Sequence, residues 1–361
     1  MSSTFEQARE FFLRGVGHYE AGELAQAERA FAAALALVPG RVSTLTNLGA
    51  VRLKLGRAEE AAALLEEALA QEPSNTEALR HRAAALAELG DHEGALAAID
   101  RALALQPIPA AWTLRGSILR TLGRTAEAAQ SYGAAAATGD TELNRFFLAS
   151  LTGREPPRAA PREYVESLFD RYAHEFEAHV VDALKYRAPE ILVHGLDASA
   201  RYEAALDLGC GTGLCGALLR PLAKRLDGVD LSGKMVERAR ATGCYDEVVH
   251  ADAVQFLERA PRAYDLVIAA DVFVYLGALE PVFAAAAGVL SAGGRFCFCV
   301  ELAPGGADVV LQPTMRYAHS ADYILKAVQQ SGFEISATAE HAIRADQGAA
   351  IPGLFFWLVR S

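Results

Sequence analysis

The stretch Leu206-Asp207-Leu208-Gly209-Cys210-Gly211-Thr212-Gly213 decides the fold of this chain. An apolar run from Ala204 to Leu208, interrupted by one acid, ends in three glycines that are each separated by a single residue. A helical pattern over Leu214 to Ala223 follows at once. The pattern predicts a buried strand, a tight loop and a helix N-terminus. Such a loop can bind a polar or anionic ligand, because glycines let the backbone approach the ligand closely and the helix N-terminus offers unpaired N–H groups.

The spacing of these glycines is G-x-G-x-G, which differs from the G-x-G-x-x-G of dinucleotide-binding enzymes. It resembles motif I of the class I S-adenosylmethionine (SAM) methyltransferases. The resemblance implies a Rossmann-like domain with a seven-stranded, mostly parallel sheet, SAM as cofactor and S-adenosylhomocysteine as product. Asp207 then anchors the methionyl ammonium, directly or through water. The loop residues implied to approach the cofactor are Gly209, Cys210, Gly211 and Gly213.

Two acids follow the next two predicted strands. Asp230 ends a short apolar strand, where an acid can accept hydrogen bonds from both ribose hydroxyls. The next residue, Leu231, is also expected to contact the cofactor. Asp252 ends the third strand, and the resemblance implies that Asp252 and Ala253 lie near the adenine amino group. Capping of a helix over 253–259 is the alternative for Asp252.

The fourth predicted strand, residues 264–270, contains five consecutive apolar residues, which suit a strand buried on both faces of a parallel sheet. Asp271 follows at its carboxyl end, so we expect it near the reacting methyl or the methionine moiety. A helix cap or a salt-bridged loop acid is the alternative. Related enzymes that methylate the amino groups of bases or the glutamine amide often carry N-P-P-Y in this loop. Here the loop to Tyr275 reads D-V-F-V-Y, so the resemblance disfavours those acceptors. A Gly293-Gly294 turn before the fifth strand extends the resemblance.

The first 140 residues repeat with a period of about 34 residues, a length typical of helical hairpins. Small residues let paired helices cross closely, and prolines end the second helices. The pattern resembles a tetratricopeptide (TPR) array of four units with a capping helix near 141–151. Such arrays usually bind a protein or peptide in their groove; support of a lid, or a homodimer, is the alternative. The glycines and following alanines that recur in register are Gly22, Gly56, Gly90 and Gly123, with Ala27, Ala61, Ala95 and Ala128.

Composition divides the chain into an α-helical TPR domain at 1–151, a proline-rich linker at 152–161, lid helices at 162–202 and an α/β SAM-binding domain at 203–361. The run F-D-R-Y-A-H-E-F at 169–176 and the later Y-R-A-P resemble the bacterial predicted methyltransferases that carry TPR repeats. In that family such helices fold over the cofactor. Tyr172 either lines the cofactor site or packs, and His174 is a candidate substrate contact.

The segment Arg316-Tyr317-Ala318-His319-Ser320 precedes the last helical pattern and matches an R-Y-A-H-S run in the same family. We expect this loop to close over the substrate. Arg316 would hold a carboxylate, and His319 would orient the acceptor or accept a proton. His174 and Tyr275 are the other candidate bases. A surface loop with Ser320 as helix cap is the alternative.

The formal net charge is −11 and no long Lys/Arg run occurs, which argues against a nucleic-acid partner. No apolar run reaches membrane-spanning length and no signal peptide is evident, so we expect a cytoplasmic protein without a membrane partner. No ligand-type spacing of His, Cys and acids stands out, which predicts a metal-independent enzyme.

Together these patterns predict a SAM-dependent methyltransferase. Its acceptor would be an O or N atom of a small molecule, or of a substrate bound to a carrier or peptide, and the TPR domain would recruit a protein or peptide. One alternative is a protein or peptide methyltransferase whose substrate the repeats bind. A second is a SAM-binding TPR scaffold without catalysis.

Overall fold

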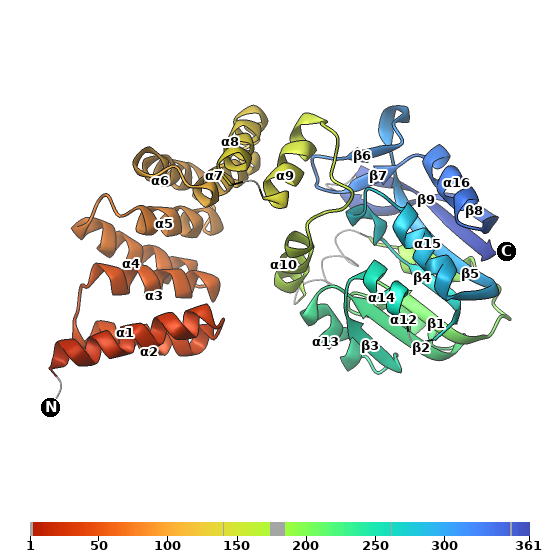
Figure 1. Ribbon diagram of the computed structural model, residues 1–361, viewed down its shortest axis with the longest axis horizontal. Helices are drawn as coiled ribbons and strands as arrows, with labels where there is room; N and C mark the ends of the chain where they lie inside the picture. The colour runs from red at the N-terminus through yellow and green to blue at the C-terminus, as the bar shows by residue number, and fades with distance from the viewer. Residues whose placement is uncertain (1–2, 140, 174–184, 261, 347–348) are drawn as a thin grey trace. The chain divides into compact units, whose positions relative to one another are not determined.

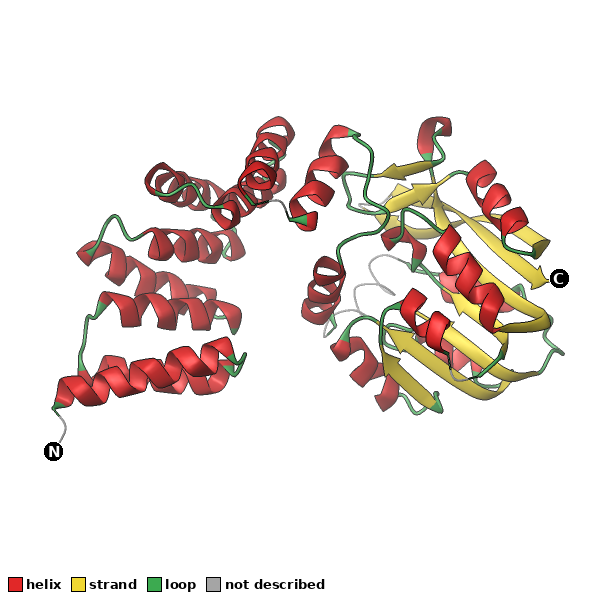
Figure 2. Ribbon diagram, viewed as in Figure 1, coloured by secondary structure: helices red, strands yellow, loops and turns green. Residues whose placement is uncertain are grey.

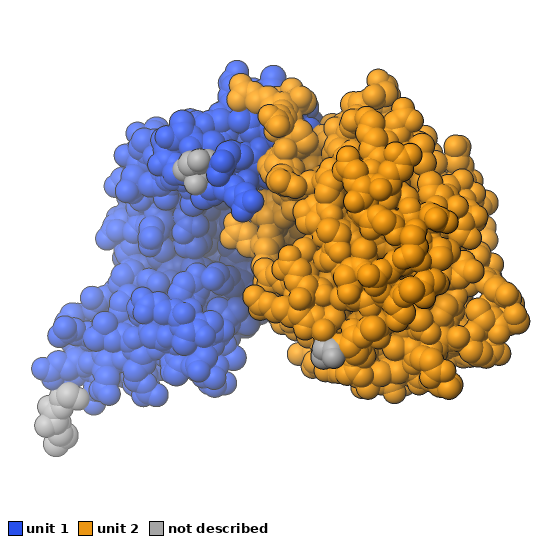
Figure 3. All heavy atoms as spheres, turned by 45° about the vertical axis from the view of Figure 1, so that its right-hand side comes forward, with its two compact units in different colours: residues 1–151 blue, residues 152–361 orange. Residues whose placement is uncertain are grey.

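A computed structural model describes residues 3–139, 141–173, 185–260, 262–346 and 349–361. The chain divides into two compact units, Met1–Leu151 and Thr152–Ser361, coloured blue and orange in Figure 3. The first unit is helical and the second is built around a mixed sheet. This confirms the predicted fold class of helical repeats followed by an α/β domain.

The first unit consists of helices that pair in sequence order, each first helix with the next (Figure 1). The turn inside each pair has a glycine with φ between +72° and +82°, a backbone conformation that side chains with a β-carbon disfavour. These are the periodic glycines of the sequence. The helices are α1 (Thr4–Glu20), α2 (Leu24–Leu37), α3 (Val42–Lys54), α4 (Ala58–Gln71), α5 (Thr76–Glu88), α6 (His92–Leu105), α7 (Pro109–Thr121), α8 (Thr125–Thr138) and α9 (Glu142–Thr152).

Each pair is held by a small residue of the first helix that faces a large buried residue of the second. A β-carbon built at Gly116 would lie 2.6 Å from the Tyr132 ring, and one at Gly49 would lie 2.8 Å from Leu65. Tyr132 and Leu65 are fully buried. Close packing of the two helices therefore depends on the missing side chain.

Among the described residues of the second unit, nine strands form one sheet in the order β3-β2-β1-β4-β5-β7-β6, with β9 paired to β5 and β8 to β9. Strands β1 to β5 run parallel, whereas β8 and β9 run antiparallel to their neighbours. The strands are β1 (Tyr202–Leu208), β2 (Ala223–Asp230), β3 (Glu247–His250), β4 (Tyr264–Ala269), β5 (Leu290–Leu302), β6 (Val309–Leu311), β7 (Tyr317–His319), β8 (Phe333–Asp346) and β9 (Ala349–Arg360).

Helices cover both faces of this sheet (Figure 2). One buried cluster joins α11 and α12 to the sheet, and another joins α14, α15 and α16 to its other side. The strands β1 and β4 are therefore buried on both faces, as their apolar runs predict. The helices are α10 (Arg162–Tyr172), α11 (Ala188–His194), α12 (Leu214–Leu219), α13 (Gly233–Ala241), α14 (Ala253–Arg259), α15 (Glu280–Val289) and α16 (Ala321–Gln330).

The expected count of seven strands omits the hairpin formed by β6 and β7. Glu301 of β5 pairs with Gly353 of β9 on one side and with Ala318 of β7 on the other. The hairpin therefore extends the sheet on the β4 side of β5, beyond the end of β4. The segment expected to be a loop at 316–320 is thus mostly strand, and only the alternative of Ser320 as the cap of α16 is as expected.

We predict that Gly116→Ala destabilises the repeats, whereas Gly133→Ala stabilises them. Overpacking against Tyr132 costs roughly 1–3 kcal/mol, while a β-carbon at Gly133 of α8 meets nothing within 4 Å and raises helix propensity by about 1 kcal/mol. Urea denaturation followed by the helical circular dichroism signal measures both. Equal stabilisation by the two variants would contradict the packing account.

Candidate active site

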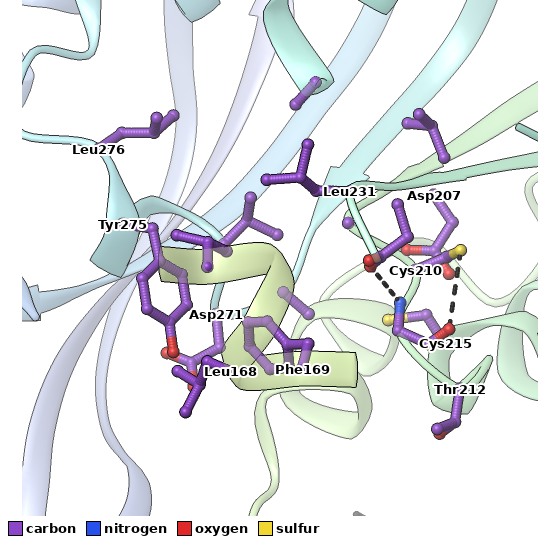
Figure 4. A pocket seen from close by; sticks show the side chains of 18 of the residues that line it. Leu168, Phe169, Asp207, Cys210, Thr212, Cys215, Leu231, Asp271, Tyr275 and Leu276 are labelled. Atoms are coloured by element: carbon purple, nitrogen blue, oxygen red, sulfur yellow. Dashed lines mark hydrogen bonds between the residues drawn. The ribbon is translucent and has the colours of Figure 1, made fainter. Parts of the chain in front are cut away.

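A cavity of about 490 Å³ opens at the carboxyl ends of β1, β2 and β4. Figure 4 shows Asp207, Cys210 and Thr212 on one side of it and Asp271, Tyr275 and Phe169 on the other. Ligands of doubly wound sheets bind at this edge. The predicted site residues that line the cavity are Asp207, Gly209, Cys210, Gly211, Asp230, Leu231, Asp252, Ala253, Asp271, Tyr275 and Arg316.

The glycine loop between β1 and α12 has left-handed backbone at all three glycines. Gly209 packs against Val272, where a β-carbon would lie 2.4 Å from a methyl group. A β-carbon at Gly211 would meet nothing within 4 Å, so this position opens onto the cavity. Gly213 does not line the cavity. It is the N-cap residue of α12, with φ +101°, and serves the turn rather than the ligand.

Asp230 fixes the glycine loop to the end of β2. Its carboxylate accepts the Gly211 N–H at 2.9 Å and the Ser232 N–H at 2.8 Å. Burial raises the pKa of Asp230, and the backbone donors oppose that shift. The sequence predicted a ribose contact, and the structure adds that the same acid holds the loop in shape.

Asp207 is fully buried beneath the loop and accepts a hydrogen bond from the Tyr245 hydroxyl at 2.6 Å. Desolvation raises the pKa of Asp207 to about 7, partly opposed by this hydrogen bond. The Tyr245 ring also covers glycine backbone, because β-carbons at Gly216 and Gly228 would lie 2.5 and 3.1 Å from it. Sequence reasoning missed Tyr245, which no motif marks.

Asp252 both lines the cavity and caps α14 by accepting the Gln255 N–H at 3.0 Å. The ligand role and the capping alternative are therefore compatible. Thr212, which sequence reasoning did not single out, also lines the cavity. Its hydroxyl is buried and has no hydrogen-bond partner among the described residues.

Asp271 adopts φ +57° just after β4 and is held by a buried arginine that the motifs did not reveal. Nη1 of Arg344 donates to both carboxylate oxygens of Asp271, at 2.8 and 3.0 Å. Burial raises the pKa of Asp271, and Arg344 opposes the shift. Asp271 is thus a salt-bridged loop acid, as the alternative prediction had it, and it also lines the cavity.

His319 lies outside the cavity lining and is fully buried in β7. Its ring stacks on Tyr323, and Nε2 lies 3.3 Å from the Gly277 carbonyl oxygen. Burial lowers the pKa of His319 to about 4. The structure therefore does not bring this histidine to the site, because the loop that was to present it forms a strand. Tyr172 ends α10, but its side chain and the whole of His174 lie outside the described residues.

The helix α10 forms one wall of the cavity through Val165, Leu168 and Phe169. It is docked by Asp170, whose carboxylate accepts the Ser232 hydroxyl at 2.5 Å at the start of α13. The preceding chain is anchored too: Ala160 N–H donates to the Tyr275 carbonyl at 2.9 Å. The end of the expected linker is thus part of the cavity wall.

No cluster of three or more His, Cys, Asp or Glu side chains that could hold a metal ion occurs among the described residues. In the same ranges, no helix has the length and apolar character needed to cross a membrane.

Two family models match the chain. The model for a methyltransferase domain matches residues 206–296, which hold the glycine loop and the strands to β5. The model for the tetratricopeptide repeat matches residues 12–75, 46–108 and 82–142. The chain carries tetratricopeptide repeats and a methyltransferase domain. The resemblances to a methyltransferase domain and to a TPR array are therefore confirmed. The match also agrees with SAM as the predicted cofactor.

The curated relatives share only part of the chain. Methyltransferase-like protein 27 of Homo sapiens is 39% identical over 85 residues, which cover 22% of this chain and 34% of that protein. A probable S-adenosylmethionine-dependent methyltransferase of Saccharomyces cerevisiae is 26% identical over 141 residues, or 37% of this chain and 48% of the relative. The chain thus spans between a third and a half of the length of these relatives.

Among solved structures, the magnesium protoporphyrin IX methyltransferase of Synechocystis with bound S-adenosylhomocysteine is 17% identical, with a TM-score of 0.44. The similarity covers 55% of this chain and 99% of that one.

The buried Asp207 predicts a specific pH dependence of stability. Because its pKa of about 7 lies above the usual 3.8, the folded state holds the proton more tightly and stability falls as the pH rises from about 4 to 7. We expect Asp207→Asn to remove roughly 2–3 kcal/mol of the difference in unfolding free energy between pH 5 and pH 8. Urea denaturation of the unliganded protein measures this difference.

Asp246→Asn is the control for that experiment. The Leu226 N–H and Arg220 hold the pKa of Asp246 below its usual range, so this acid is ionised at both pH values. Its loss should change stability equally at pH 5 and pH 8. An Asp207→Asn profile parallel to wild type would contradict the pKa assigned to Asp207.

Proposed function

We propose that the second unit binds SAM in the cavity and transfers its methyl group to an O or N acceptor. The acceptor belongs to a small molecule or to a substrate bound to a carrier or peptide, and the repeats recruit a protein or peptide partner. The observation that carries this proposal is the open space over Gly211, next to a loop that Asp230 holds in left-handed backbone.

The residues around that space fit the cofactor. Asp207 can face the methionyl ammonium, Asp230 the ribose hydroxyls and Asp252 the adenine amino group. The buried hydroxyl of Thr212, which has no partner among the described residues, offers one further polar contact. Gly211 leaves room that any other residue would fill. SAM supplies a methyl group already activated on a sulfonium.

The chain's own task is then to align the acceptor and to exclude water. Apolar surface on the α10 side comes from Leu168, Phe169 and Tyr275. The rings of Phe169 and Tyr275 pack edge to face, with their centroids 5.5 Å apart. Burial raises the pKa of Tyr275, so its hydroxyl stays protonated and can donate a hydrogen bond rather than accept a proton.

Proton transfer places a further condition on the acceptor. No histidine is found among the described residues that line the cavity, and Asp271 is tied to Arg344. An acceptor that needs little help from a base, such as a carboxylate or a neutral amine, therefore fits this site better than an alcohol does. Under this proposal His319 supports the fold and is not the base.

The two alternatives differ in where the methyl group goes. If the repeats bind the substrate itself, the product is a methylated protein or peptide. If the protein is a scaffold, SAM binds but no methyl group leaves it. A homodimer through the repeats is compatible with either outcome.

Transfer of a labelled methyl group from SAM tests the proposal. The full chain is incubated with separate small-molecule and protein fractions of a cell extract, and we expect label in one of them. Label in neither fraction, with SAM bound, would favour the scaffold. Failure of the full chain to bind S-adenosylhomocysteine in calorimetry would reject the proposed function and both alternatives.

A chain that begins at Thr152 tests recruitment by the repeats. This start keeps the segment around Ala160 that forms part of the cavity wall. We expect it to bind S-adenosylhomocysteine like the full chain but to methylate its acceptor more slowly. Equal rates for the two chains at low acceptor concentration would contradict recruitment.

A further inference from the structure

The charged side chains of the cavity wall differ between its two ends. Asp207, Asp230 and Asp252 surround the glycine-loop end, which the proposed function gives to the cofactor. At the other end, Arg316 and Arg344 line the cavity beside Asp271. Glu301 joins these two arginines, because it accepts from Arg344 and lies 3.8 Å from Arg316. The side chains that could bind an anion therefore lie where the acceptor would bind.

Arg344 reaches the cavity because β8 is irregular at this point. The register with β9 shifts between Ala342 and Arg344, and Ile343 is buried in the adjoining core. Such bulges redirect a side chain. Arg344 is only 5% exposed, and it donates to Asp271 through Nη1 and to Glu301 through Nη2. Its charge is therefore compensated within the protein.

Glu301 links Arg344 to a second arginine. It is buried, its Oε1 also lies 3.8 Å from Nη1 of Arg316, and its Oε2 accepts from the Gln312 side chain at 2.8 Å. Gln312 N–H in turn donates to the Arg316 carbonyl at 2.9 Å, which closes the turn between β6 and β7. The β6–β7 hairpin is thus fixed with Arg316 at the cavity.

Arg316 differs from Arg344 in that its guanidinium N–H groups make no hydrogen bond to the residues that the structure describes. Its contact with Glu301 is longer than a hydrogen bond, and its side chain is 27% exposed while lining the cavity. A guanidinium has five N–H donors in a planar fork that matches a carboxylate. Arg344 is already bonded to Asp271 and Glu301, so Arg316 is the one of these two arginines that can bind an anion.

We propose that the methyl acceptor is an organic acid with an apolar body, whose carboxylate is bound by Arg316 and whose body lies against Leu168, Phe169 and Leu276. This inference rests on the proposed function and names its substrate class. A carboxylate is favoured over a phosphate because Glu301 lies 3.8 Å from Arg316 and repels a divalent anion more strongly than a monovalent one.

Benzoate and its neutral analogue benzamide are the probes. Each is titrated into the full chain by calorimetry, with and without saturating S-adenosylhomocysteine. We expect benzoate to bind at least tenfold more tightly than benzamide. Arg316→Gln should abolish that preference, and Arg316→Lys should keep only part of it because an ammonium lacks the fork. Arg201→Gln, which removes an exposed arginine of the same unit, should leave it unchanged.

Different results would contradict the proposed function and the carboxylate site at Arg316. If wild type does not bind S-adenosylhomocysteine, the proposed function is wrong. The benzoate titration in the absence of S-adenosylhomocysteine still tests the role of Arg316. Equal affinity for benzoate and benzamide, or a preference that survives Arg316→Gln, would overturn the inference. Tighter binding of phenylphosphonate than of benzoate would overturn the assignment of a carboxylate. A circular dichroism spectrum of Arg316→Gln that matches wild type shows that this variant folds.

Discussion

The hydrogen bond from the Gly211 N–H to Asp230 is the constraint on which the site depends. It joins a loop after β1 to the end of β2, so the parallel pairing of these strands sets the position of the loop. Gly209 and Gly211 both have left-handed backbone and line the cavity, and the absent side chain at Gly211 leaves the space open. The Tyr245 hydroxyl donates to Asp207 in β1, two residues before Gly209.

Burial of charge organises the rest of the cavity. The acids at the glycine loop are costly without partners, and backbone N–H groups and the Tyr245 hydroxyl stabilise them. At the opposite end Asp271 and Glu301 are buried only because Arg344 lies between them. One cavity thus has acids held by backbone N–H groups and a tyrosine hydroxyl at the glycine-loop end, and acids paired with an arginine at the other end.

The sequence predicted the features that are local along the chain. The repeat glycines, the glycine loop and the acids at strand ends all follow from patterns within a few residues. Arg344 and Tyr245 were missed because their partners Asp271 and Asp207 lie far away in sequence and only the sheet brings them together. The position of Arg344 also depends on a bulge, which no residue pattern marked. The β7 strand has three residues, too few to show an alternating pattern, so His319 was assigned to a loop.

Calorimetric binding of S-adenosylhomocysteine to Gly211→Ala tests the central claim most directly. The control is Gly243→Ala, which has a similar left-handed φ of +68° and open space but does not line the cavity. Both variants place alanine in left-handed backbone, which costs roughly 1–2 kcal/mol. The account predicts that Gly211→Ala weakens binding at least tenfold while Gly243→Ala binds like wild type. Equal affinities for the two variants would contradict it.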